Sequence, residues 1–213
     1  MLAYGGLTQE AFDAGQRYYE GYFVLAADLD FGGEENTWIK RLGYNYNGAE
    51  NNGFKGVFDG RGHTIANVSL SEYDGLFGGV HRAATIKNVA FTGMTVSILG
   101  GIFGRECSGK LENVFIDVTF DGTDDTAVLG FYAYASAGLN NVVIALHGTL
   151  ASENYAVLAT GEFAGANITN CYIITNGLPI KEYSAFTVGE TSVTATGLPT
   201  EYWDLSGDYP VFK

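Results

Sequence analysis

The sequence predicts an all-β fold in which one chain winds into a solenoid of stacked parallel strands. The first observation behind this is a motif of an aliphatic residue, any residue, Asn and an apolar residue. Its asparagines are Asn67, Asn88, Asn113, Asn141 and Asn170, separated by 21, 25, 28 and 29 residues. Such a recurrence is typical of a solenoid, in which each repeat buries its apolar face only by stacking on its neighbours.

A second motif keeps step with the first, and it consists of Gly, an aliphatic residue, Phe and a turn-forming residue. Clear copies are Gly56–Asp59, Gly75–Gly78 and Gly101–Gly104, and degenerate copies begin at Ala127, Ala156 and Ser184. This spacing is too short for a helical crossover, so each turn should hold short parallel strands joined by tight corners. We therefore expect about six coils, stacked over roughly 30 Å.

The repeating asparagines fit an inner corner of the coil. There, each side-chain amide can bond the asparagine of the next coil, so we expect a structural ladder of Asn67, Asn88, Asn113, Asn141 and Asn170. The residue after each Asn should point inward, as should Phe91, Ile116, Ile144 and Ile173 two positions further on.

The residues between those inward positions should face outward, and this outer face becomes apolar late in the chain. Phe115, Val143, Tyr172 and Ile174 would form an apolar row on one sheet. Patches of this kind indicate a covering segment, a partner or a ligand. The tail from Glu201 to Phe212 could cover the row, and the alternative is that Phe115, Tyr172 and Ile174 bind a partner or a glycan.

The remaining elements follow in order within a single domain, residues 1–213. Residues 1–20 should form a short helical N-terminal cap, with Thr8 as its capping residue. Residues 21–177 should form the coils, beginning with the alternating stretch Tyr22–Phe31. Residues 178–213, which contain all three prolines, should form the last coil and an irregular C-terminal cap that protects the open edge.

Residues 32–53 are rich in Gly and Asn and should form an irregular loop. The loop contains Trp38, Tyr44 and Tyr46, whose rings could stack on sugars or could pack the loop against the coils. Both alternatives are open at this point.

The formal net charge of −13 opposes binding to nucleic acid or to an anionic membrane surface. No apolar run approaches the roughly 18 residues of a membrane-spanning helix, and no signal peptide is visible. The two cysteines, Cys107 and Cys171, fall about two coils apart, too far for a disulfide, so we expect free buried thiols. The chain is expected to be a monomer or part of a longer chain.

Candidates for chemistry are few. Asp121, Asp124 and Asp125 lie in a Gly-containing turn and could serve only the turn, could form a Ca²⁺ site or could supply the carboxylates of a glycosidase. The histidines lack a metal spacing, and no nucleophile elbow or nucleotide-binding loop is present. We therefore expect no catalytic residue and no cofactor, with Ca²⁺ as the alternative.

The stretch from Phe54 to Ile65, then Gly75–Gly78 and Ile86–Val89, resembles the GLUG-motif repeats of bacterial surface and secreted proteins. The lead-in Tyr22–Phe31 and the closing Tyr202–Pro210 are also similar to the ends of such repeats. The resemblance implies a right-handed parallel β-helix outside a bacterial cell, associated with adhesion, and it supplies no catalytic residue.

These observations predict a non-enzymatic, adhesin-like module at the cell surface or in the extracellular space. It would bind a host or matrix glycan or protein, or serve as a structural segment of a larger surface protein. Because parallel β-helices also act as polysaccharide lyases and glycoside hydrolases, a carbohydrate-active enzyme is the alternative. Paired carboxylates about 5–10 Å apart in an outer groove would favour the enzyme.

Overall fold

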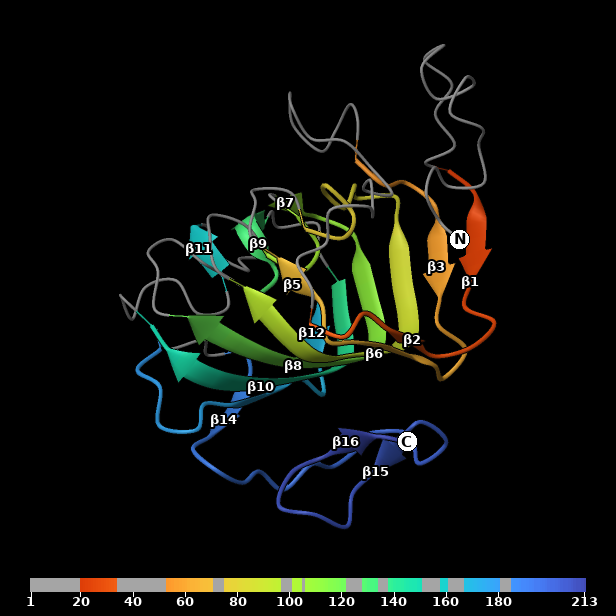
Figure 1. Ribbon diagram of the computed structural model, residues 1–213. Helices are drawn as coiled ribbons and strands as arrows, with labels where there is room; N and C mark the ends of the chain where they lie inside the picture. The colour runs from red at the N-terminus through yellow and green to blue at the C-terminus, as the bar shows by residue number, and fades with distance from the viewer. Residues whose placement is uncertain are drawn as a thin grey trace.

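The computed structural model of the protein describes residues 20–33, 53–70, 75–96, 101–104, 106–121, 128–133, 138–150, 158–160, 167–180 and 185–213. Within these ranges the chain forms strands and no helix (Figure 1). Most strands belong to two parallel sheets of eleven and three strands, and the last two form an antiparallel pair. The fold is therefore all-β and solenoid-like. The described residues include no helix long and apolar enough to span a bilayer.

The main sheet is built from successive passes of the chain. Its central path runs in sequence order through β1 (Tyr22–Val24), β3 (Val57–Asp59), β6 (Thr85–Val96), β8 (Lys110–Asp121), β10 (Gly138–Thr149), β13 (Tyr172–Ile174) and β14 (Thr187–Gly189). Shorter strands widen it: β2 (Leu29–Asp30) pairs with β4 (Thr64–Ala66), β4 and β5 (Ser69–Leu70) pair with β6, and β12 (Ile168–Thr169) pairs with β10. Parallel neighbours that follow one another in sequence confirm direct winding.

The second sheet stacks three successive passes of the chain on the other side of the core. It contains β7 (Glu106–Cys107), β9 (Gly130–Ala133) and β11 (Leu158–Thr160), all parallel. Beside it, Leu76 N–H donates to the Ile102 carbonyl at 2.8 Å, and Ile102 N–H donates to the Val128 carbonyl at 2.9 Å. The copies of the second motif that begin at residues 75, 101 and 127 therefore stack as the sequence predicts.

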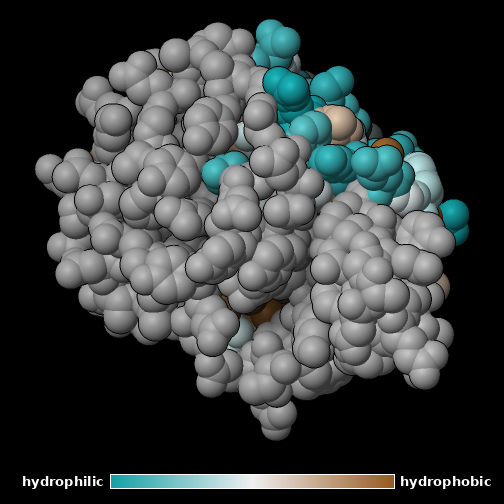
Figure 2. All heavy atoms as spheres, turned by 90° about the horizontal axis from the view of Figure 1, so that it is seen from above, coloured by the Kyte–Doolittle hydropathy of each residue, from teal (hydrophilic) through white to brown (hydrophobic). Residues whose placement is uncertain are grey.

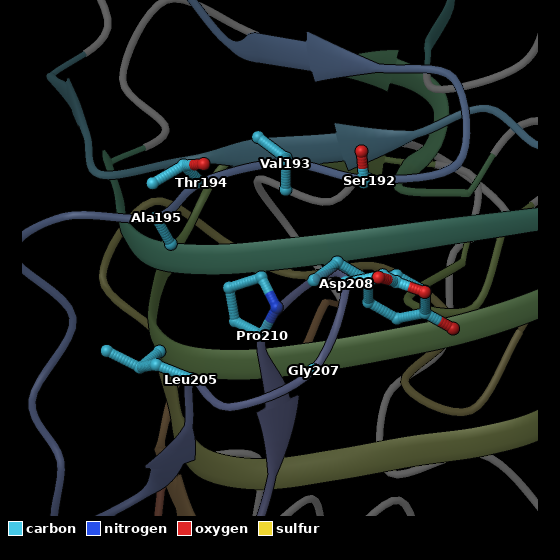
Figure 3. Close-up of a pocket in the computed structure, with 9 residues that line it drawn as sticks. Ser192, Val193, Thr194, Ala195, Leu205, Gly207, Asp208 and Pro210 are labelled. Atoms are coloured by element: carbon cyan, nitrogen blue, oxygen red, sulfur yellow. The ribbon is translucent and has the colours of Figure 1, made fainter.

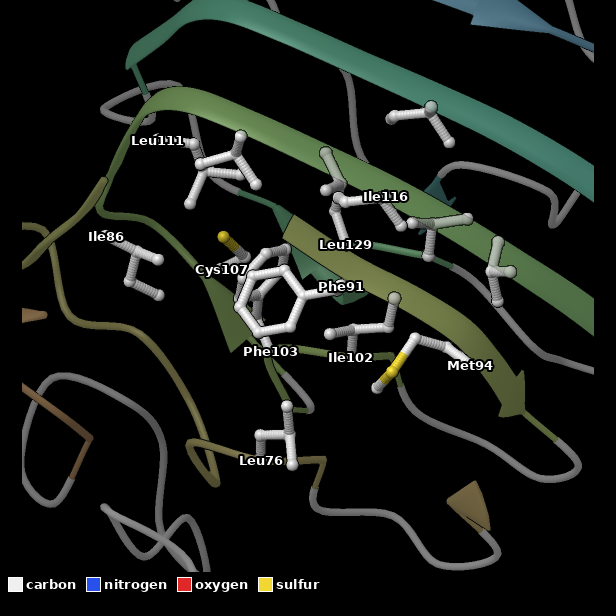
Figure 4. Close-up of a cluster of buried hydrophobic side chains, with 14 of the residues drawn as sticks. Leu76, Ile86, Phe91, Met94, Ile102, Phe103, Cys107, Leu111, Ile116 and Leu129 are labelled. Carbon is white, nitrogen blue, oxygen red and sulfur yellow. The ribbon is translucent and has the colours of Figure 1, made fainter. Parts of the chain in front are cut away.

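The core lies between these two sides and is almost entirely apolar. Phe77 and Phe103, from successive copies of the second motif, have ring centroids 6.0 Å apart, and Phe91 meets Phe103 edge-on at 5.5 Å. Figure 4 shows Ile86, Leu111 and Ile116 of the main sheet facing this cluster. The predicted inward residues Phe91, Ile116, Ile144 and Ile173 are all fully buried. On the face seen in Figure 2, by contrast, hydrophilic groups predominate among the described residues.

Both cysteines are buried free thiols, as expected. Burial raises the pKa of Cys107 to about 12 and that of Cys171 to about 11, so neither is poised to react as a thiolate.

The structure corrects the alignment of the first copy of the second motif, Gly56–Asp59. It does not stack on Gly75–Gly78, because β3 pairs with the start of β6, with Val57 opposite Thr85 and Phe58 opposite Ile86. An aliphatic–Phe pair fits either side of a coil, since both sides send alternate residues into the same core. The similar sequences Gly56–Asp59 and Gly75–Gly78 therefore lie on two different sides of the coil.

Asn67 is corrected for the same reason and lies outside the predicted ladder. In β4, Ala66 stands opposite Thr92, which places Asn67 beside Gly93 and not beside Asn88. Its Nδ2 donates to Asp30 Oδ1 at 2.9 Å, so it serves a second corner. Both Asn67 and Gly93 have positive φ, 57° and 58°, which explains why either residue type suits that corner.

The C-terminal tail folds back as an antiparallel pair, β15 (Trp203–Asp204) and β16 (Val211–Phe212), with Trp203 opposite Phe212. Figure 1 shows this hairpin beside the long strands β8 and β10 rather than in line with them. The tail therefore lies on the outer face of the main sheet.

Candidate functional site

The ladder is the most regular polar feature of the molecule. Asn170 Nδ2 donates to Asn141 Oδ1 at 3.1 Å, Asn141 Nδ2 to Asn113 Oδ1 at 2.8 Å, and Asn113 Nδ2 to Asn88 Oδ1 at 3.0 Å. Their φ angles lie between 52° and 57°, in the left-handed region that Asn tolerates better than most residues. Each asparagine therefore turns the backbone and bonds its neighbour at once.

Asp59 takes the place that the sequence assigned to Asn67 at the start of the ladder. Asn88 Nδ2 donates to Asp59 Oδ1 at 3.1 Å, and the corner itself is formed by Arg61, with φ 53°. Tyr22 Oη donates to Asp59 Oδ2 at 2.7 Å, and Lys87 Nζ lies 3.5 Å from the same oxygen. Lys87 Nζ also lies 5.9 Å from the centre of the Tyr22 ring. A nearly buried carboxylate thus joins the ladder to the first strand.

These contacts set the ionisation of Asp59. Partial burial alone would raise the pKa of Asp59, but the hydrogen bonds from Tyr22, the Arg61 N–H and Asn88, with the charge of Lys87, outweigh burial and lower it. Because the pKa is lower in the folded state, the unfolded chain binds more protons in acid. The stability that Asp59 contributes is complete above about pH 4 and is lost as the pH falls through the lowered pKa.

Replacing Asp59 with asparagine should weaken the dependence of stability on pH in this acidic window. The free energy of unfolding in urea, measured from about pH 6 down to about pH 2, should fall less steeply for the variant than for the wild type. Glu190→Gln, at an exposed carboxylate, is the matched control and should leave the slope nearly unchanged. Parallel curves for the wild type and Asp59→Asn would contradict the role given to these contacts.

The apolar row on the outer face is covered by the tail. Phe115, Tyr172 and Ile174 are 5%, 4% and 0% exposed, and they form a second buried cluster with Leu198 and Trp203. Tyr172 Oη donates to the Thr196 carbonyl at 2.8 Å and accepts from the Thr196 N–H at 3.0 Å. Of the two alternatives for this row, the structure shows the intramolecular cover, and the binding role predicted for these three side chains is wrong while the tail is in place.

The tail contains a pocket of its own, of about 290 Å³ (Figure 3). One wall is the extended segment 192–195, and the other is formed by Leu205 and residues 207–210. The Val193 N–H donates to the Asp208 carbonyl at 2.9 Å and holds the two walls together. Polar groups of Ser192, Thr194 and Asp208 line the pocket together with apolar side chains, so the pocket can contact a ligand that has both polar and apolar groups.

A carboxylate–imidazole pair lies on the same outer face. His147 Nε2 is 3.0 Å from Asp117 Oδ1, and Asn176 Nδ2 is 3.3 Å from His147 Nδ1. Asp117 also acts on the tail: burial raises the pKa of Tyr209, and the charges of Asp117 and Asp208 raise it further. The pair and the pocket are thus electrostatic neighbours.

Several predicted site residues lie outside the described residues, namely Trp38, Tyr44 and Tyr46 of the loop and Asp124 and Asp125 of the turn. Asp121 is the last residue of β8. In the part of the chain that the structure describes, no three His, Cys, Asp or Glu side chains are arranged to hold a metal ion. The Ca²⁺ site and the sugar-stacking loop stay predictions.

Sequence reasoning did not single out the residues that line the tail pocket. The sequence predicts the tail as a cover for the apolar row and as part of the C-terminal cap, and it shows no periodic pattern from which facing residues could be inferred.

Comparison of the chain with protein-family models, with curated proteins and with solved structures gives no match.

Proposed function

We propose that this chain is a non-enzymatic module of a cell-surface or extracellular protein, similar to the GLUG-motif repeats. In this proposal the stack is a right-handed parallel β-helix of about six coils, closed at its N-terminal end by residues 1–20 and at its C-terminal end by the last coil. It binds a host or matrix glycan or protein in an adhesin-like manner, or it serves as a structural segment of a larger surface protein.

The observation that carries the proposal is the continuous chain of side-chain hydrogen bonds from Asp59 to Asn170. The repeated polar side chains hydrogen-bond one another from coil to coil, which is the arrangement of residues that stabilise a fold. Catalytic side chains would instead be directed towards a substrate. The net charge of −13 further supports a partner other than nucleic acid.

Binding of the intact protein to a glycan array, with mucin and matrix proteins spotted in parallel, tests the proposal. The adhesin reading expects saturable binding to at least one class, retained at physiological salt. Absence of binding to every glycan and every protein would overturn that reading and leave the structural-segment reading, which predicts none.

A carbohydrate-active enzyme is the second candidate, and the Asp117–His147 pair favours it. A histidine held by a carboxylate at 3.0 Å is oriented for proton transfer. Incubation with a panel of polysaccharides, followed by reducing-end and unsaturated-product assays, separates the two candidates. Turnover that His147→Gln abolishes would establish the enzyme and remove the non-enzymatic proposal.

A further inference from the structure

We propose that the tail pocket is a binding subsite for one neutral sugar residue of a glycan. This inference rests on the glycan-binding form of the proposed function and names the place and the ligand class. Three features of the pocket carry it: polar side chains to which no other described side chain is hydrogen-bonded, an apolar surface beside them, and a negative field.

The polar groups of the pocket are free to bond a ligand. Asp208, Ser192 and Thr194 are exposed, and no side-chain hydrogen bond from another described residue reaches any of the three. An ionised carboxylate can accept from two hydroxyls at once, and such charge-assisted bonds are stronger than neutral ones. Two adjacent hydroxyls of a sugar ring fit Asp208 in this way, with the hydroxyls of Ser192 and Thr194 on the opposite wall.

The apolar part of the lining suits the C–H face of a sugar ring. Tyr209 is half-buried and lines the pocket, and Pro210 is buried behind the same wall, so the exposed part of the Tyr209 side chain is the surface that a sugar ring would meet. A volume of about 290 Å³ admits a single sugar residue and its attachment to the next. The lining as a whole is more polar than apolar, which suits a ligand that carries several hydroxyls beside its C–H face.

The charge of the site selects against acidic sugars. Asp208 and Asp117 both act on Tyr209, and the protein as a whole carries −13. A uronate or sialate carboxylate would enter against this field, whereas a neutral hexose would not. The raised pKa of Tyr209 keeps its phenol protonated, so it can still donate a hydrogen bond.

The pocket is held in shape before any ligand arrives. The Val193–Asp208 backbone bond joins its walls, and Tyr172 anchors the adjoining residue Thr196 through two hydrogen bonds. Trp203 fixes the other arm of the tail in the buried cluster. Preorganisation of this kind lowers the ordering cost that otherwise weakens the binding of small ligands.

The test is a titration of the ¹⁵N-labelled intact protein with methyl glycosides of neutral hexoses and, separately, of uronic acids. Backbone amide shifts should gather at residues 192–195 and 205–209 with the neutral set only. Asp208→Asn, which keeps the shape of the side chain and removes its charge, should weaken binding about tenfold. Glu201→Gln makes the same charge change on an exposed tail residue outside the pocket and should leave the affinity unchanged.

The outcomes separate this inference from the proposed function. If Asp208→Asn binds neutral sugars as tightly as the wild type, or if the amide shifts gather elsewhere, the assignment of the tail pocket as the subsite is wrong. The proposal of a glycan-binding module then still stands. Equal or tighter binding of uronates would overturn the assigned ligand class. No shift with any glycoside, together with a blank glycan array, would overturn both the pocket and the glycan-binding form of the proposed function. An unchanged thermal midpoint for Asp208→Asn excludes unfolding as the cause of lost binding.

Discussion

Replacing Trp203 with alanine should lower the free energy of unfolding by about 3–5 kcal/mol, the range for removing a large buried aromatic side chain. Trp203 is 1% exposed and meets Phe115 and Phe212 edge-on, with ring centroids 6.3 Å and 5.4 Å apart. Without it, the tail loses the side chain that fills the space above the outer face. Urea unfolding followed by circular dichroism measures the loss, and increased binding of an apolar dye should report the uncovered row.

Trp203→Phe is the matched control, because the indole N–H has no hydrogen-bond partner among the described residues. Phenylalanine keeps an aromatic ring and removes a buried donor that costs free energy when it is unpaired. We therefore expect Trp203→Phe to retain most of the stability that Trp203→Ala loses. A loss below about 1 kcal/mol for Trp203→Ala would mean that the tail contributes little to holding the outer face.

Asn113→Ala should lower the free energy of unfolding by about 2–4 kcal/mol, from two separate causes. The substitution leaves Asn88 Oδ1 without its donor and Asn141 Nδ2 without its acceptor. It also places an alanine at φ 53°, where its Cβ is crowded by the following carbonyl. Chemical denaturation of the purified variant checks the sum of both effects.

Asn113→Gly separates the two causes, since glycine adopts positive φ without a steric penalty but cannot bond its neighbours. The glycine variant should therefore be more stable than the alanine variant and less stable than the wild type. Equal stability of the two variants would show that the backbone conformation contributes nothing. A wild-type midpoint for both would rule out any stabilisation by the ladder.

The alternation of side chains around each repeating asparagine was predictable from the sequence. A strand sends successive residues to opposite faces, so once Val114 points inward, Ile116 must follow it and Phe115 must face out. The structure has Val114 and Ile116 in the main core and Phe115 in the outer cluster. The alternation of side chains along a strand depends only on neighbouring residues, so it can be predicted directly from the sequence.

The register of the first coils was not predictable in this way. A corner with positive φ is formed by Arg61, by Asn67, by Asn88 or by Gly93, so no residue type marks one corner. The choice between Asp59 and Asn67 as the neighbour of Asn88 depends on how β3 and β4 align with β6, which only the three-dimensional pairing decides. The tail pocket is not predictable from the sequence for a related reason, since residues 192–195 and 205–210 meet only when the tail folds back on itself.

The ladder has a direction, because each asparagine donates from Nδ2 towards the preceding coil and the series stops at a carboxylate that cannot donate. Similar repeats invite a slip of one whole coil during folding, since each coil could stack on the wrong neighbour. If such a slip placed Asp59 between two asparagines of the ladder, its carboxylate would face the side-chain Oδ1 of the preceding asparagine. Neither oxygen carries a hydrogen, so the two would repel each other. The single carboxylate at the end of the ladder therefore penalises any pairing that would place Asp59 between two asparagines.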